Sequence, residues 1–108
     1  MNFTEYQKKS RETAAYPDIG KSFVYPTLGL VGEAGEIAEK VKKVFRDSNA
    51  TTDEWKKELS KELGDVLWYL AQLTTEFDLS FDDIATQNIE KLQSRKKRGT
   101  IHGDGDNR

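Results

Sequence analysis

One short pattern of apolar and acidic residues occurs twice in the sequence, and it constrains the fold more than any other feature. Each copy holds a leucine, two acids three residues apart and a β-branched residue: Leu30, Glu33, Glu36 and Ile37, then Leu59, Glu62, Asp65 and Val66. Successive residues of an α-helix are rotated by about 100°. The first acid of each copy therefore borders the apolar stripe of its helix, with the second on one flank. Two helices are predicted to carry acidic pairs toward the core.

Turn and capping signals divide the sequence into four helical segments, and no segment shows the alternation of a strand. Thr4 with Gln7 and Ser80 with Asp83 have capping spacing, and Gly99 is typical of a helix end. The predicted helices run from Thr4 to about Ala15, Pro26 to about Phe45, Thr52 or Asp53 to about Phe77, and Ser80 to about Lys97. Because short connections place neighbouring helices antiparallel, we predict an all-α, four-helix bundle-like fold. It forms a single domain, residues 1–98, followed by a flexible, glycine-rich polar tail, residues 99–108.

Composition limits the size of the core and the kinds of chemistry available. The chain has 108 residues, of which 35% are hydrophobic and 33% charged, so we expect a thin core completed by homo-oligomerisation. It has no cysteine, which excludes disulfides and thiol chemistry. No apolar run resembles a signal peptide or a membrane span, so we expect a cytoplasmic protein without a membrane partner. The net charge of −2 argues neither for nor against nucleic-acid binding, and no nucleic-acid polymer is a predicted partner.

The two acidic pairs need a counter-charge. Like charges three residues apart on a helix repel, and carboxylates are almost never fully buried unless they are paired. A divalent cation supplies that charge, and an all-oxygen ligand set suits Mg²⁺, Mn²⁺ or Ca²⁺. Mg²⁺ characteristically binds carboxylates together with substrate phosphates. A di-iron centre is not expected, because His102, in the tail, is the only histidine. The alternative is that two Glu-x-x-Glu-type pairs arose by chance in acidic helices.

The sequence around these acids resembles that of the MazG-type all-α nucleotide pyrophosphohydrolases. The similar segments are GLVGEAGE at residues 29–36, ELGDVLWYL at residues 62–70 and NIEKL at residues 88–92, with Arg95, Arg98 and Gly99 beyond. The resemblance covers residues 28–108. It implies hydrolysis of a (deoxy)nucleoside triphosphate to a monophosphate and pyrophosphate, in a dimer or tetramer of helical bundles. It also implies Mg²⁺, with Mn²⁺ as a substitute, as the cofactor.

The resemblance assigns roles to the acids and to one aromatic residue. Glu33, Glu36, Glu62 and Asp65 are the expected metal ligands, and Glu33 or Glu36 is the candidate base toward water. Tyr69, one turn beyond Asp65, is expected to stack on a nucleobase. The alternative is that it covers the edge of the bundle or a subunit contact.

Three polar residues of the last predicted helix share one face because they follow i, i+3, i+7 spacing: Asn88, Lys91 and Arg95. The resemblance gives Lys91 and Arg95 the β- and γ-phosphates, and Asn88 the sugar or a phosphate. The alternative is a solvated helix face.

Other residues and other functions stay open at this stage. Gly29, Gly32 and Gly35 recur within a helix, which predicts close helix approach or access for substrate. Trp68 is expected at an interface. The rival functions are a phosphoribosyl-ATP pyrophosphohydrolase-like enzyme, an enzyme for modified or alarmone nucleotides, and a non-enzymatic helical interaction module.

Overall fold

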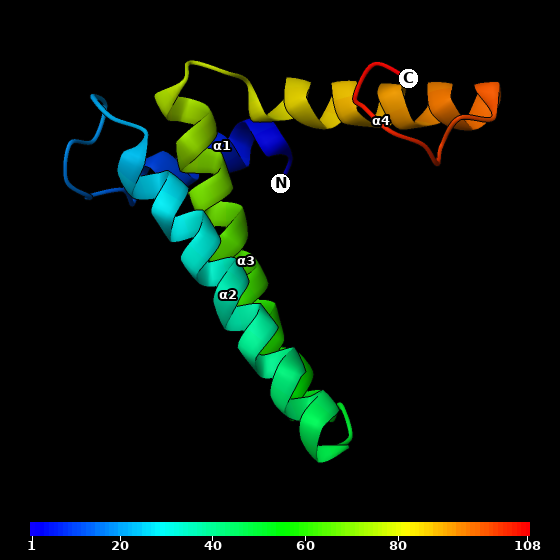
Figure 1. Cartoon of the computed structure of the whole chain (residues 1–108). Helices are drawn as coiled ribbons and strands as arrows, with labels where there is room; N and C mark the ends of the chain where they lie inside the picture. The colour runs from blue at the N-terminus through cyan, green and yellow to red at the C-terminus, as the bar shows by residue number, and fades with distance from the viewer.

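The computed structural model describes all residues 1–108 and contains four α-helices and no strand (Figure 1). The helices are α1 (Phe3–Glu12), α2 (Val24–Asp47), α3 (Asp53–Glu76) and α4 (Phe81–Arg98). The predicted all-α class is confirmed. No helix of the chain is both long and apolar enough to pass through a bilayer.

Local capping explains where the last two helices begin. The Thr52 side chain accepts a hydrogen bond from the backbone N–H of Trp55 at 3.2 Å, and Ser80 accepts one from Asp83 at 3.1 Å. Gly99 ends α4 with a φ of 73°, in the left-handed region that glycine adopts without strain. The sequence predicted each of these caps.

The first two helices begin differently from the prediction. Asn2, rather than Thr4, caps α1 by accepting a hydrogen bond from the backbone N–H of Glu5 at 2.8 Å. Gln7, the expected partner of Thr4, is engaged elsewhere: it donates to the Thr75 hydroxyl at 3.1 Å and accepts from the Phe81 N–H at 2.9 Å. The predicted capping box at Thr4 was therefore wrong. Helix α2 has no side-chain cap and begins two residues before Pro26.

Helices α2 and α3 form a long antiparallel hairpin, and one glycine explains how they fit together (Figure 1). A Cβ at Gly29 would lie 2.2 Å from Cε1 of Tyr69, so only glycine lets the tyrosine ring rest against the backbone of α2. Nothing lies within 4 Å of a Cβ at Gly32 or Gly35. Of the three glycines, Gly29 alone matches the expected close approach.

Helix α1 crosses the hairpin near its open end and contacts α3 but not α2 (Figure 1). Ser10 of α1 accepts a hydrogen bond from the buried Gln72 amide at 3.0 Å. The Trp68 indole N–H donates to the Thr13 hydroxyl at 2.8 Å. Trp68 thus lies at the contact between α3 and the end of α1, and a role at a subunit interface stays a prediction.

A buried carboxylate ties the loop between α1 and α2 to α3. Glu76, whose side chain is 2% exposed, accepts from Arg11 at 3.0 Å, from the Gly20 N–H at 3.1 Å and from the Tyr16 hydroxyl. Arg11 also donates to the Tyr16 oxygen at 2.6 Å. We call Arg11, Tyr16, Gly20 and Glu76 the Glu76 cluster. It holds the loop against α3.

Helix α4 extends away from the hairpin, so one chain does not close a four-helix bundle (Figure 1). The radius of gyration is 16.8 Å, against about 13 Å expected for a compact domain of this length. Only 8 of the 108 residues are buried, and Phe45 is 87% exposed. The apolar surface that would close the bundle has no partner within the chain, which is why closure stays a prediction for an oligomer.

Candidate metal centre and nucleotide site

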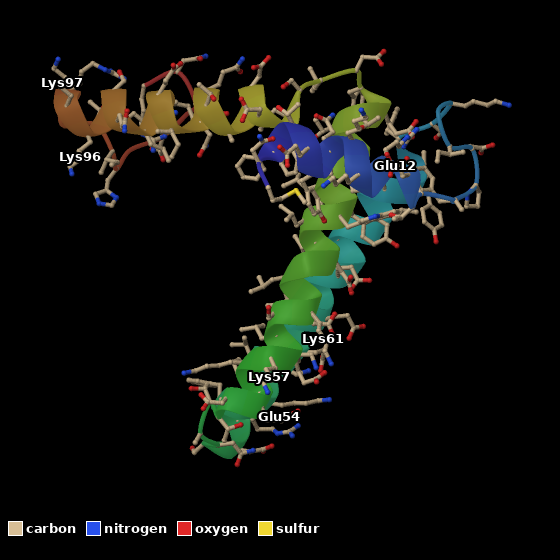
Figure 2. The ribbon with its side chains drawn as sticks, turned by 180° about the vertical axis from the view of Figure 1, so that it is seen from behind. Glu12, Glu54, Lys57, Lys61, Lys96 and Lys97 are labelled. Carbon is tan, nitrogen blue, oxygen red and sulfur yellow. The ribbon has the colours of Figure 1, made fainter.

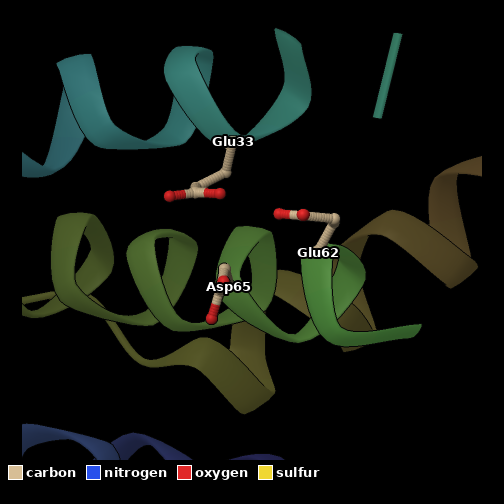
Figure 3. Close-up of side chains that lie close together, drawn as sticks. All are labelled: Glu33, Glu62 and Asp65. Carbon is tan, nitrogen blue, oxygen red and sulfur yellow. The ribbon is translucent and has the colours of Figure 1, made fainter. Parts of the chain in front are cut away.

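Three of the four predicted acids converge between α2 and α3. One carboxylate oxygen from each of Glu33, Glu62 and Asp65 lies within 4.8 Å of the other two. Figure 3 shows Glu33 reaching from α2 toward the helix that carries Glu62 and Asp65. Glu33 and Glu62 are half-buried, and Asp65 is exposed. We call these three residues the acid cluster.

Like charges dominate the electrostatics of the acid cluster. Partial burial raises the pKa of Glu33 above its ordinary value, and the negative charges of Asp65, Glu62 and Glu36 raise it further. Lys40 of α2 lies 3.9 Å from Glu62, at the outer limit of an ion pair. The cluster therefore holds more negative charge than the nearby cation balances.

Lys40 is a site residue that the sequence interpretation missed. It follows Glu33 by seven residues, close to two helical turns, so both side chains share one face of α2. That spacing was visible in the sequence.

Glu36, the fourth predicted acid, lies outside the acid cluster and is exposed. Its charge still contributes to the raised pKa of Glu33. On α3, Glu58 precedes Glu62 by one turn and forms an ion pair with Lys61 at 3.0 Å. The structure thus separates the acids of this region into a converging group and flanking residues.

Tyr69 lies beside the acid cluster, with its ring against Gly29. Its ring centroid is 5.0 Å from that of Trp68 and 6.4 Å from that of Tyr25. Burial is the main cause of the raised pKa of Tyr69, and the charges of Glu33 and Asp65 also raise it. The contact with Gly29 matches the alternative interpretation, in which Tyr69 covers the edge of the helix pair. Stacking on a base stays a prediction.

The three predicted residues of α4 lie on a helix that does not contact α2 and that leads away from the end of α3 (Figure 1). The structure therefore does not bring Asn88, Lys91 and Arg95 to the acid cluster of the same chain. The tail turns back along α4 instead: the Arg95 guanidinium donates to the Asp106 carbonyl at 2.5 Å, and Lys91 lies 3.4 Å from the Asp106 carboxylate. Asn88 is exposed. Flexibility of the tail, residues 99–108, stays a prediction.

The acid cluster has the chemistry that a hard divalent cation requires. Every ligand atom it offers is a carboxylate oxygen, which suits Mg²⁺ or Mn²⁺ and disfavours metals that select sulfur or imidazole. Its unbalanced charge is what a bound cation would neutralise. The residues present therefore fit a divalent cation.

The fold and the site together define an all-helical protein whose two longest helices present converging carboxylates. Comparison with known families makes this specific: residues 26–100 match the family described as the MazG nucleotide pyrophosphohydrolase domain. The chain belongs to this family. "Gene 37 protein" of Mycobacterium phage L5 is 48% identical over 114 residues, a match that covers all of both chains. No solved structure matches the chain.

Proposed function

We propose that the protein is a Mg²⁺-dependent nucleoside triphosphate pyrophosphohydrolase. It cleaves a (deoxy)nucleoside triphosphate between the α- and β-phosphates and releases a monophosphate and pyrophosphate. The observation that carries this proposal is the acid cluster, whose three carboxylate oxygens lie within 4.8 Å in a chain of the MazG family. Such a reaction removes nucleotides from the cytoplasmic pool, which suits a housecleaning role.

Residues from both α2 and α3 would bind the metal ion. Glu33, Glu62 and Asp65 would hold the ion, and Lys40 limits the charge around Glu62. A bound Mg²⁺ supplies charge for the phosphate oxygens and lowers the pKa of a coordinated water. Glu36 either completes the ligand set or accepts the proton of the attacking water; a Glu36→Gln variant that keeps its Mg²⁺ affinity but loses activity identifies the base.

A second copy of the chain would complete the bundle and the site. Leu28 and Val31 are each 67% exposed, and both lie on the side of α2 that faces away from α3. A helix that is apolar on both sides is usually buried on both. Because α4 does not reach the acids of its own chain, we infer that Lys91 and Arg95 face the acids of a second copy.

Light scattering tests the second copy directly. Val31→Asp should shift the mass from a dimer or tetramer toward a monomer, because a charge would enter the apolar contact. Lys57→Asp is the matched control, since the Lys57 side chain projects outward from the far part of the hairpin (Figure 2). A monomeric wild-type chain would contradict the proposed assembly.

The reaction is tested by a panel of nucleotides with Mg²⁺, in which pyrophosphate and orthophosphate are measured separately. Pyrophosphate with a matching monophosphate is the expected result. Orthophosphate would identify a different phosphohydrolase, and turnover of phosphoribosyl-ATP alone would favour that substrate. No product from any nucleotide would contradict the proposal and favour an interaction module.

A further inference from the structure

Tyr25 is the outer ring of an aromatic stack at the start of α2. Its ring centroid lies 5.3 Å from that of Tyr16, and the two planes differ by only 3°. Tyr16 is 7% exposed, whereas Tyr25 is 43% exposed. The inner ring is therefore covered by the chain, while much of the outer ring remains open to solvent.

The inner ring is held in one orientation by the Glu76 cluster. The Tyr16 hydroxyl donates to Glu76 and accepts from Arg11, so polar contacts fix its far end. The Trp68 ring meets Tyr16 edge-on, with centroids 6.3 Å apart. A rigid Tyr16 in turn limits the orientations of Tyr25, which lowers the entropy that Tyr25 would lose on binding a flat ligand.

Tyr25 lies on the same flank of α2 that leads to the acid cluster. It precedes Glu33 by eight residues, a rise of about 12 Å along the helix. This span is comparable to the reach of a nucleotide from its base to its phosphates. Gly29 and Gly32 fall on the flank between them, and nothing lies within 4 Å of a Cβ at Gly32. The flank is therefore open at Gly32, while at Gly29 the Tyr69 ring covers it, so a ligand that runs from Tyr25 to the acids would pass on the Gly32 side.

Tyr69 is less suited to receive a base than the sequence indicated. A Cβ at Gly29 would meet Cε1, Cδ1 and Cζ of its ring at 2.2–2.5 Å, so the backbone of α2 covers one part of the ring. Tyr69 is tilted by 45° from Tyr25, and its ring lies against Gly29, which falls between Tyr25 and Glu33 in α2. It is placed to bound the path rather than to extend the stack.

We propose that Tyr25 is the residue on which the nucleobase stacks. The base lies on the exposed part of the Tyr25 ring, the sugar passes Gly32 and the phosphates reach the acid cluster. This inference rests on the proposed function, because it takes the acids as the phosphate end of the site. Aromatic stacking accepts every base, so Tyr25 contributes affinity for nucleosides in general.

Steady-state kinetics with two variants of one position test the stack. Tyr25→Leu should raise KM for nucleoside triphosphates about 10-fold, within the range that loss of a stacked aromatic gives. Tyr25→Phe keeps the ring and should stay within about twofold of wild type. Inorganic tripolyphosphate has no base, so its inhibition constant should be the same in wild type and both variants.

Phe23→Leu is the matched control. Phe23 is also an exposed ring, 51% exposed, and it stacks on Phe77 with centroids 5.1 Å apart. Its loss should leave KM unchanged, since it lies away from the Tyr25 flank. An unchanged KM in Tyr25→Leu would overturn the inference and leave the proposed function standing. A weaker inhibition by tripolyphosphate in that variant would also overturn it, because the damage would then extend to the phosphate end. A wild-type chain inactive on every nucleotide would overturn both proposals.

Discussion

The Glu76 cluster and the acid cluster each place a carboxylate of the α2–α3 helix pair against a neighbouring element. The two clusters shift the pKa of that carboxylate in opposite directions. Burial alone would raise the pKa of Glu76, but hydrogen bonds from Tyr16, the Gly20 N–H and Arg11 outweigh it and lower the pKa. For Glu33, burial and three neighbouring acids act together and raise the pKa. The chain supplies donors where a carboxylate holds the fold together. Around Glu33 it places three further acids instead, and the one ion pair of the acid cluster joins Lys40 to Glu62 at 3.9 Å.

The largest expected difference between the two clusters is in catalysis. Asp65→Asn removes one ligand charge of the acid cluster, so kcat/KM should fall about 100-fold or more while helical content stays near wild type. Glu58→Gln is the matched control, since Glu58 pairs with Lys61 one turn away on α3. Nucleotide hydrolysis and circular dichroism measure the two quantities. Equal activity in Asp65→Asn and Glu58→Gln would remove the metal assignment.

The free energy of unfolding should depend more on the Glu76 cluster than on the acid cluster, the reverse of the order expected for catalysis. Glu76→Gln leaves Arg11 without its charged partner and weakens three hydrogen bonds, so the free energy of unfolding should drop by about 2–3 kcal/mol. Glu33→Gln removes a repulsive charge, so unfolding in metal-free buffer should become no easier than in wild type. Urea titrations of both variants provide the measurement. A loss of stability in Glu33→Gln as large as that in Glu76→Gln would mean that the two clusters serve the same purpose.

Mg²⁺ should stabilise the wild type and not the acid-cluster variants. An ion that binds only the folded chain adds about 2.7 kcal/mol at one hundred times its dissociation constant. The melting temperature should therefore rise with added Mg²⁺ in wild type and in Glu76→Gln, but not in Asp65→Asn. Thermal melts with EDTA as the reference test this. An equal rise in all three chains would indicate binding elsewhere.

The two carboxylates should also give opposite pH dependence. The lowered pKa of Glu76 stabilises the fold above the ordinary glutamate pKa, and this contribution is lost as pH falls through the folded-state value. The raised pKa of Glu33 has the other sign: its cost appears as pH rises from the ordinary value through the folded-state value. In EDTA, Glu76→Gln should flatten the acid-side loss of stability, and Glu33→Gln should gain stability toward neutral pH. Parallel curves for the two variants would refute the contrast.

The sequence predicted the acid cluster better than the Glu76 cluster, and the reason is the range of the contacts. Glu33, Glu62 and Asp65 lie in helices with clear apolar stripes, and their phase predicted that they converge; the same phase also predicted Glu36, which lies outside the acid cluster. Glu76 meets Arg11 and Gly20, which lie 65 and 56 residues earlier. Those contacts depend on a loop whose course has no periodic signal.

The same reasoning applies at the ends of the chain. The caps at Thr52 and Ser80 were predictable because each is a contact between residues three apart. The cap at Asn2 was missed because Gln7, which was read as part of a local capping box, bonds to Thr75 and Phe81 instead. The direction of α4 was not predictable, because it depends on contacts that are distant in the sequence: the Phe81 ring packs against Phe3 and Tyr6 of α1, with centroids 4.8 and 6.3 Å away. Long-range partners, absent from any local pattern, decided the start of α1 and the direction of α4.

The smallest expected effect concerns Lys91 and Arg95, the two cations of α4 that were predicted to bind phosphates. Unlike the acid cluster, Lys91 and Arg95 already have a partner, since both lie within 3.5 Å of the Asp106 carboxylate. If they bind phosphates, the tail must release them first, and Asp106 competes with substrate. Asp106→Ala should then lower KM about twofold to fivefold, a small effect because Asp106 is largely exposed and water screens the pair. Lys91→Ala should raise KM instead. Steady-state kinetics of both variants measure these changes in KM, and Asp104→Ala is the control for loss of a tail charge. If the tail only covers the helix and does not compete with substrate, Asp106→Ala should give the same KM as Asp104→Ala.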